Sequence, residues 1–120
     1  MTPSNDHDPD RLYIAVRADL SPGLQTAQAV HAALHFLHDH PNVVRPWLLT
    51  SNFLVVVSVP DEAALLDLIT DASRCGLLRT AVREPDLDNA ATAVAIEPGE
   101  RARRLCGALP LALRQENAMT

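Results

Sequence analysis

The sequence predicts an α/β layered fold built on a mixed sheet. Two continuous apolar runs, at 12–16 and 53–59, have the length of buried strands, and each leads into a segment with helical periodicity. Two further strand-like runs, 77–83 and 91–96, are separated by a short acidic connection that suits an antiparallel hairpin. Strands joined through helices and a hairpin in the same sheet make that sheet mixed.

The composition favours one domain with an aliphatic core. The chain has 120 residues, of which 48% are hydrophobic and only 3% are aromatic, and domains cluster near roughly 100–150 residues. We expect the domain to span 11–112, with a disordered acidic lead-in at 1–10 and a tail at 113–120. No apolar run reaches the ~18 residues of a membrane helix. The two cysteines form no spaced framework, so a reduced, cytoplasmic protein is expected.

The charge of the chain bears on its partners. The formal net charge is −5, and all ten basic residues are arginines. Nucleic-acid affinity depends mainly on cations that neutralise phosphates. The net negative charge therefore makes tight RNA binding less expected, although an acidic chain can still carry a local basic patch.

The first strand leads into a long helix. Ser21 can cap this helix and Pro22 suits its first position, because the N–H that proline lacks would be unbonded there. Arg17 and Asp19 follow the carboxyl end of the strand, where ligands usually bind in α/β sheets, so they are candidate site residues. A surface ion pair or a helix cap explains them equally well. The apolar positions expected to face the core are Leu24, Ala27, Val30, Leu34 and Leu37.

A second stripe on the same helix carries Gln28, His31, His35 and His38. The histidines recur at i, i+4 and i+7, so their side chains could converge on a Zn²⁺ ion. No second cluster of ligands follows at ligand spacing, and a solvated polar stripe explains the pattern more simply. We therefore expect no metal and no cofactor.

The middle of the chain is expected to build the core. Two prolines in 41–51 end the helix, and Trp47 closes a corner of the core in a short helical turn. The run 53–59 is expected to be a buried strand. The helix after it extends to about Arg74, with Cys75 on its apolar face and Gly76 just beyond its end.

Three carboxylates lie in the connection between the last two strands: Glu84, Asp86 and Asp88. Crowded carboxylates can divide general acid and base roles, and their oxygens can bind a hard cation. The ordinary loop composition of this segment is the plainer explanation. The last helix runs from Glu100 to about Cys106, and its three arginines are either a solvated face or phosphate contacts.

Several separated motifs resemble the type 2 peptidyl-tRNA hydrolase family. The opening motif is Arg17-x-Asp19-Leu20, then Gly23, then Ala27-Gln28-x-x-His31-Ala32-Ala33. The later ones are Ala81-Val82-Arg83-Glu84, Thr92-Ala93-Val94-Ala95-Ile96-Glu97-Pro98 and Gly107-Ala108-Leu109-Pro110-Leu111. The family has a lysine where this chain has Leu24, and the Thr and Gln that follow its third strand have no clear counterpart.

The resemblance implies a three-layer α/β/α fold around a small mixed four-stranded sheet. It also implies cleavage of the ester between a peptide and the terminal ribose of tRNA. Asp19 and His31, with Glu84 or Asp86, would position or activate water. Arg17, Arg79 and Arg83 would contact phosphates, and Gln28 would orient the substrate. Either an arginine from elsewhere or the backbone N–H groups at Gly23 would have to stabilise the oxyanion in place of the lysine.

Two other functions remain open from the sequence. One is a non-catalytic member of the same fold that binds a ligand, a protein partner or a second copy of itself. A homodimer is a candidate assembly. The other is a divergent hydrolase of small esters or amides that binds no nucleic acid.

Overall fold

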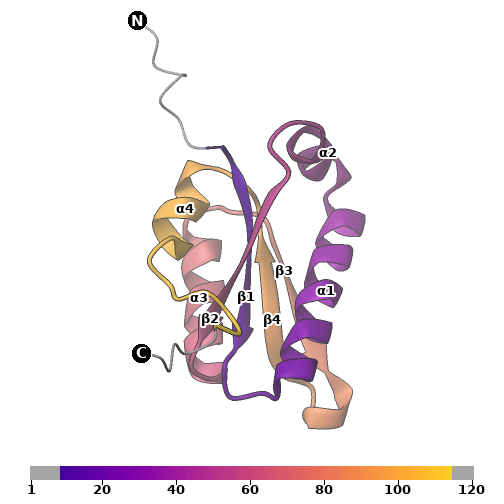
Figure 1. Cartoon of the computed structure of the whole chain (residues 1–120), viewed down its shortest axis with the longest axis vertical. Helices are drawn as coiled ribbons and strands as arrows, with labels where there is room; N and C mark the ends of the chain where they lie inside the picture. The colour runs from indigo at the N-terminus through magenta and orange to yellow at the C-terminus, as the bar shows by residue number, and fades with distance from the viewer. Residues whose placement is uncertain (1–8, 115–120) are drawn as a thin grey trace, which may run out of the picture.

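The computed structural model describes residues 9–114 (Figure 1). The elements in chain order are β1 (Arg11–Arg17), α1 (Pro22–Asp39), α2 (Pro41–Leu49), β2 (Phe53–Val59), α3 (Glu62–Arg74), β3 (Arg79–Glu84), a 3₁₀ turn (Pro85–Leu87), β4 (Ala90–Ile96) and α4 (Glu100–Cys106). The expected lead-in at 1–10 and tail at 113–120 lie mostly outside the described residues.

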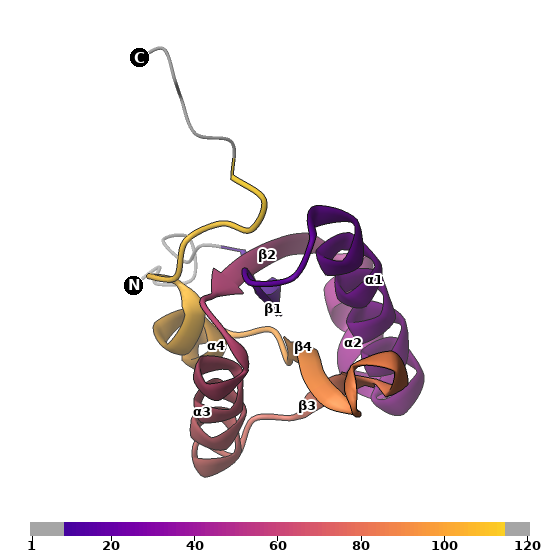
Figure 2. The ribbon, with the colours of Figure 1, turned by 90° about the horizontal axis from the view of Figure 1, so that it is seen from below.

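The four strands form one mixed sheet in the order β2-β1-β4-β3. β1 and β2 are parallel, whereas β4 is antiparallel to both β1 and β3. β3 and β4 form the hairpin that the sequence predicts. Helices α1 and α2 cover one face of the sheet, and α3 and α4 cover the other (Figure 2). The predicted three-layer α/β fold with a four-stranded mixed sheet is confirmed.

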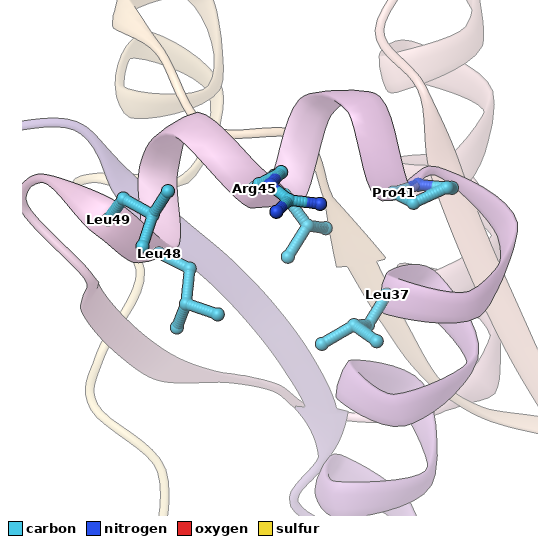
Figure 3. A pocket seen from close by; sticks show the side chains of 6 residues that line it. Leu37, Pro41, Arg45, Leu48 and Leu49 are labelled. Atoms are coloured by element: carbon cyan, nitrogen blue, oxygen red, sulfur yellow. The ribbon is translucent and has the colours of Figure 1, made fainter.

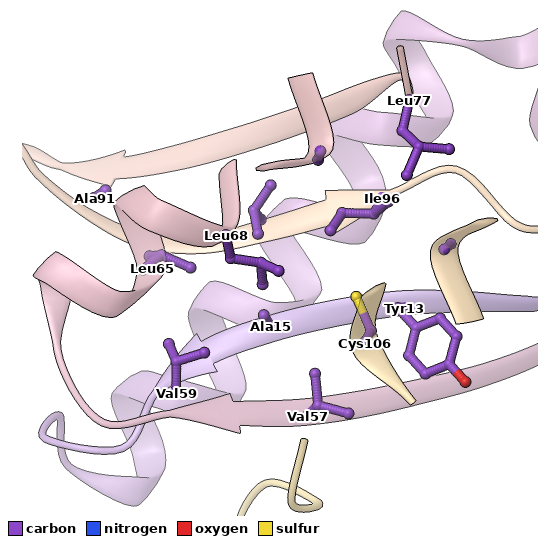
Figure 4. Close-up of a cluster of buried hydrophobic side chains, with 13 residues drawn as sticks. Tyr13, Ala15, Val57, Val59, Leu65, Leu68, Leu77, Ala91, Ile96 and Cys106 are labelled. Carbon is purple, nitrogen blue, oxygen red and sulfur yellow. The ribbon is translucent and has the colours of Figure 1, made fainter. Parts of the chain in front are cut away.

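The core on the α3 side is aliphatic, as the composition predicts. Leu65 and Leu68 of α3 pack over Val57 and Ile96 of the sheet, and Tyr13 closes one end of the cluster (Figure 4). α3 begins as expected, because the Asp61 side chain accepts a hydrogen bond from the Ala64 N–H at 2.9 Å. Aliphatic burial on this face is a main source of stability.

The buried face of α1 differs from the predicted one. Val30, Leu34 and Leu37 were expected in the core, but they are 51%, 60% and 46% exposed. The helix instead buries a stripe of Gln25, Gln28, Ala29, Ala32 and Phe36. Small alanines let the helix lie close to the alanine-rich strand β4, and both glutamines make hydrogen bonds, so their burial carries no large penalty.

β2 is an edge strand, which corrects the expectation of a strand buried on both faces. Phe53 and Leu54 at its start are exposed, whereas Val57 and Val59 are buried. The chain after α4 returns along this edge: the Ser58 N–H donates to the Pro110 carbonyl at 2.8 Å, and the Ala112 N–H donates to the Val56 carbonyl at 2.9 Å. This returning segment pairs part of an edge that would otherwise be open to other strands.

Two smaller expectations need correction. The connection at 41–51 contains a helix, α2, rather than one short turn, and Trp47 within it is buried as predicted and donates to the Phe53 carbonyl at 2.9 Å. Cys75 is exposed rather than part of the core, because it caps α3 beside the left-handed Gly76. Within the described residues, no helix is both long and apolar enough to cross a membrane.

Candidate functional site

One end of the sheet gathers most of the predicted site residues. β1 ends there at Arg17 and β3 ends there at Glu84. β4 starts there at Ala90, because it runs antiparallel to both neighbours. The N-terminus of α1 reaches the same end after the turn that follows β1 (Figure 1, lower end). We call this the site end of the sheet.

Arg17 and Asp19 form a two-point ion pair at the site end. Arg17 Nε donates to Asp19 Oδ1 at 3.0 Å and Nη2 donates to Oδ2 at 2.9 Å. The third nitrogen, Nη1, donates to the Ala91 carbonyl of β4 at 3.0 Å. The hydrogen bond between the two opposite charges lowers the pKa of Asp19 and raises the pKa of Arg17. Asp19 therefore stays ionised, and its side chain remains 42% exposed to an incoming group.

Gln28 lies at the centre of a second hydrogen-bonded group. Its Nε2 donates to Glu84 Oε1 at 2.9 Å, and its Oε1 accepts from the Thr92 hydroxyl at 2.8 Å. Gln28 is 2% exposed and Thr92 is fully buried. The two bonds fix both ends of the amide, so the Glu84 carboxylate is held against α1 in one orientation.

A β-bulge in β4 turns the Thr92 side chain toward Gln28. In the β3–β4 ladder, Val82 pairs with Ala93 and Arg83 pairs with Ala91, so Thr92 has no partner across the ladder. Thr92 and Ala93 consequently both face α1, where regular alternation would have turned one of them away. The extra residue places a hydroxyl at the site end inside an otherwise apolar strand.

The acidic connection is ordered around Glu84. Glu84 Oε2 accepts from the backbone N–H of Asp86 at 3.1 Å and so caps the 3₁₀ turn, while the Asp86 side chain is exposed. Arg83 Nη1 donates to the Asn89 carbonyl at 3.1 Å across the same hairpin. Glu84, Asp86 and Arg83 thus all lie at the site end.

Gly23 lies in the first turn of α1. Ser21 caps the helix as predicted, accepting from the Leu24 N–H at 3.4 Å through its side chain. The first N–H groups of a helix have no partner within it, and the positive end of the helix dipole lies there. A Cβ at Gly23 would meet no atom within 4 Å, so the space beside its Cα is open. Leu24 beside it is half-buried and brings no charge.

Two predicted site residues stand apart from this group. Arg79 starts β3 opposite Ile96, so it lies roughly 17 Å along the strand from Glu84, at the other end of the sheet. His31 is exposed on α1, one turn after Gln28, and its ring contacts the His35 ring at a centroid distance of 6.3 Å. Among residues 9–114, no three His, Cys, Asp or Glu side chains gather closely enough to hold a metal ion.

An apolar hollow of about 280 Å³ lies between the end of α1 and α2 (Figure 3). It is lined by Leu37, Pro41, Val44, Arg45, Leu48 and Leu49. These residues lie at the far end of α1 from Gln28, and none of them offers a carboxylate, an imidazole or a nucleophile. The polar and charged side chains described above lie at the site end instead.

The sequence interpretation missed two residues that shape the site. Thr92 was taken only as part of a strand motif, although a lone hydroxyl within the apolar run 91–96 was a signal that could have identified it. Glu62 in the first turn of α3 is the second, and its Oε2 accepts from the Ala91 N–H at 2.9 Å. Ala91 is thereby held on both sides, by Glu62 at its N–H and by Arg17 at its carbonyl.

The residues from 11 to 111 match the family described as peptidyl-tRNA hydrolase PTH2. The chain belongs to this family. The curated relative named "Peptidyl-tRNA hydrolase 2, mitochondrial", from Mus musculus, is 31% identical over 112 residues. The alignment covers 88% of this chain and 59% of the mouse protein, so the chain spans well under two thirds of that relative's length.

The PTH2 match includes every residue of the site end. Arg17, Asp19 and Gln28 lie in its first part, and Glu84 and Thr92 lie in its second. The suspected family relationship is confirmed.

Proposed function

We propose that this protein hydrolyses the ester bond between a peptide and the terminal ribose of tRNA. Membership of the PTH2 family supports this reaction. The observation that carries the proposal is the fixed amide of Gln28, held by Thr92 and Glu84 beside the Arg17–Asp19 ion pair. Water adds to the ester carbonyl carbon, the bond to the ribose oxygen breaks, and that oxygen takes up a proton.

In this proposal Asp19 orients the substrate. Its lowered pKa makes it a weak base, so it is poorly suited to remove a proton from water. An ionised, half-exposed carboxylate is a strong acceptor for a ribose hydroxyl or a peptide N–H. Arg17, which holds Asp19 and Ala91 at once, keeps that acceptor in place and adds positive charge to the site end.

Glu84 is the base that we assign to the attacking water. A carboxylate has about four lone-pair positions, and the bonds from Gln28 Nε2 and the Asp86 N–H occupy two of them. The remaining positions can accept a hydrogen bond from water. His31, one turn along α1 from Gln28, is the second candidate for this role, and Asp86 supports Glu84 through its backbone.

The N-terminus of α1 supplies the oxyanion contact in this proposal. Leu24 has no ammonium group, so the positive end of the helix and the Gly23 N–H take the part of the family lysine. Donors aimed at developing negative charge contribute most when they are fixed in advance. Gly23 meets this condition because it lies in the first turn of a capped helix.

A hydrolysis assay on peptidyl-tRNA tests the proposal. Asp19→Asn, Glu84→Gln and His31→Ala are compared with matched controls, Asp88→Asn in the same exposed connection and His38→Ala two turns along α1. Loss of a positioned base or orienting group is expected to lower the rate by roughly 10²–10⁴-fold, with both controls near the wild-type rate. If Glu84→Gln stays active and His31→Ala does not, His31 is the base.

The absence of cleavage by the wild-type protein, at any substrate concentration, would overturn the hydrolase proposal. Binding of tRNA without cleavage would then favour the non-catalytic role. Two further expectations remain predictions: association as a homodimer, tested by light scattering, and a cytoplasmic location, whereas the mouse relative is named as mitochondrial.

A further inference from the structure

Three arginines share an unusual arrangement on the α3 and α4 side of the molecule. Arg83 Nη1 donates to the Asn89 carbonyl at 3.1 Å, and Arg79 Nη1 donates to the Leu77 carbonyl at 3.0 Å. Arg101 of α4 donates to the Cys75 carbonyl in the same way. Each guanidinium is therefore held by a main-chain carbonyl, and all three side chains belong to exposed residues.

The two strand arginines lie on the same face as α4. Arg79 pairs with Ile96 and Arg83 pairs with Ala91, and directly paired residues in an antiparallel ladder point to the same side. Ile96 and Ala91 belong to the core beneath α3 and α4. Arg101 reaches the turn that leads into β3. Arg83 and Arg79 therefore lie along β3, and Arg101 lies beside the turn that precedes the strand. We call these three residues the β3 arginine row.

A carbonyl anchor positions a guanidinium without cancelling its charge. Among residues 9–114, the ion pairs Arg17–Asp19 and Arg103–Glu100 include none of the row. An arginine has five N–H donors, so one bond to a carbonyl leaves most of each group able to hold a phosphate oxygen. Arg79 and Arg83 are roughly 14 Å apart along the strand, a span that covers several phosphates of a nucleic-acid backbone.

The surrounding acids favour the end of the row away from the site. Asp86 and Asp88 lie in the hairpin beside Arg83, where they repel phosphate. At the other end, the half-buried Glu97 accepts from the Leu78 N–H and keeps its charge, whereas Glu100 is paired with Arg103 at 3.7 Å, so fewer exposed carboxylates oppose phosphate there. Arg79 and Arg101 are therefore the stronger phosphate contacts.

We propose that the β3 arginine row binds the phosphate backbone of the substrate tRNA, with Arg79 and Arg101 as the main contacts. This inference rests on the proposed function. The ester is placed at the site end, and Arg79 lies roughly 17 Å from Glu84 along β3. A few unpaired nucleotides at the 3′ end span that distance, so the row meets the backbone where the paired stem begins.

The test compares Arg79→Gln/Arg101→Gln with Arg45→Gln, a control arginine exposed on α2 across the sheet. The double variant is expected to raise KM for peptidyl-tRNA roughly tenfold. In a plot of log affinity for uncharged tRNA against log salt concentration, its slope is expected to be smaller in magnitude by about 1.5, because each lost phosphate contact removes about 0.7–0.9. Arg45→Gln is expected to match the wild type in both. Arg79→Lys/Arg101→Lys is expected to restore most of the salt slope, because the charge is kept.

An unchanged KM and salt slope in the Gln double variant would overturn the arginine row, while cleavage by the wild type would leave the proposed function standing. Salt-sensitive tRNA binding that the double variant loses, without cleavage by the wild type, would support the row and overturn the hydrolase. A wild-type protein that neither binds nor cleaves tRNA would overturn both. Circular dichroism confirms that each variant is folded.

Discussion

The Thr92 hydroxyl lies 2.8 Å from Gln28 Oε1 and joins residues that are 64 positions apart in the chain. Both side chains are buried between α1 and the sheet. The bond fixes how far α1 is rotated about its axis, because a rotated helix would leave the buried Gln28 amide oxygen unpaired, whereas the Thr92 hydroxyl could still donate to the Val82 carbonyl at 3.2 Å. It also turns the other end of the amide toward Glu84, so one contact serves both the core and the site end.

Thr92→Val is expected to destabilise the protein by about 1–3 kcal/mol. Valine nearly keeps the shape of threonine, but it leaves the buried Gln28 Oε1 without its donor. Urea denaturation measures the change. Thr80→Val is the control, because Thr80 bonds to the Asp39 carboxylate, where water can replace it. Equal stability of Thr92→Val and the wild type would show that the Gln28 amide finds another donor.

Asp19→Asn is expected to change the acid limb of the stability profile. The folded pKa of Asp19 lies below its ordinary value of 3.8, so the ion pair stabilises the protein fully above about pH 4 and loses this contribution as the pH falls through the lower folded value. The effect stays within about 1 kcal/mol, because the carboxylate is 42% exposed and screened by solvent. Denaturation of wild type and variant between pH 2 and pH 7 should therefore converge at low pH, and a constant difference would contradict the ion pair.

Two substitutions at Gly23 distinguish a role of its backbone N–H from a role of its missing side chain. Gly23→Ala is expected to keep hydrolysis and to stabilise α1 by roughly 0.5–1 kcal/mol, since a Cβ there meets no atom within 4 Å. Gly23→Pro removes the N–H in a helical turn that makes no use of it, and circular dichroism checks that α1 still forms, because a proline at 23 restricts Pro22 before it. We expect the proline variant to lose at least roughly tenfold in hydrolysis rate if the N–H contacts the oxyanion. Equal rates in the two variants would exclude that contact.

Two residues of α1 test the corrected orientation of the helix. Leu34→Glu is expected to change stability by no more than about 0.5 kcal/mol, because Leu34 is exposed. Phe36→Ala, two positions along, is expected to cost about 3–5 kcal/mol, because Phe36 is fully buried. Thermal unfolding at low protein concentration measures both. A large loss in Leu34→Glu at this concentration would contradict the exposed position of Leu34.

The two cysteines are expected to react at very different rates. Burial raises the pKa of the Cys106 thiol to about 12, so it is both inaccessible and un-ionised at neutral pH. Cys75 is exposed at the end of α3. A colorimetric thiol reagent at pH 8 should therefore label one cysteine quickly and the second only after denaturation, with Cys75→Ser removing the fast phase. Two fast equivalents would show that α4 opens readily.

Most of the strands and helices could be predicted from the sequence. The predicted strand 53–59 matches β2, the last helix matches α4, and the Ser21 cap and the hairpin are present. These features depend on neighbours in sequence: apolar runs, caps, prolines and short connections. The prediction of the buried face of α1 was wrong because this helix has apolar residues on two sides. Periodicity alone cannot decide which of the two sides packs against the sheet.

The sequence by itself determined the four strands, the helices α1, α3 and α4, their order, the mixed sheet and the family motifs around Asp19, Gln28 and Glu84. Only the tertiary structure decided that β2 is an edge strand, that Gln28 is buried between Thr92 and Glu84, and that Arg79 lies far from the site end while Arg83 lies within it. The physical reason is that strand order, the bulge at Thr92 and the rotation of α1 arise from contacts between segments distant in the chain. Such contacts are chosen by packing and by the pairing of buried polar groups, which leave no periodic trace in the sequence.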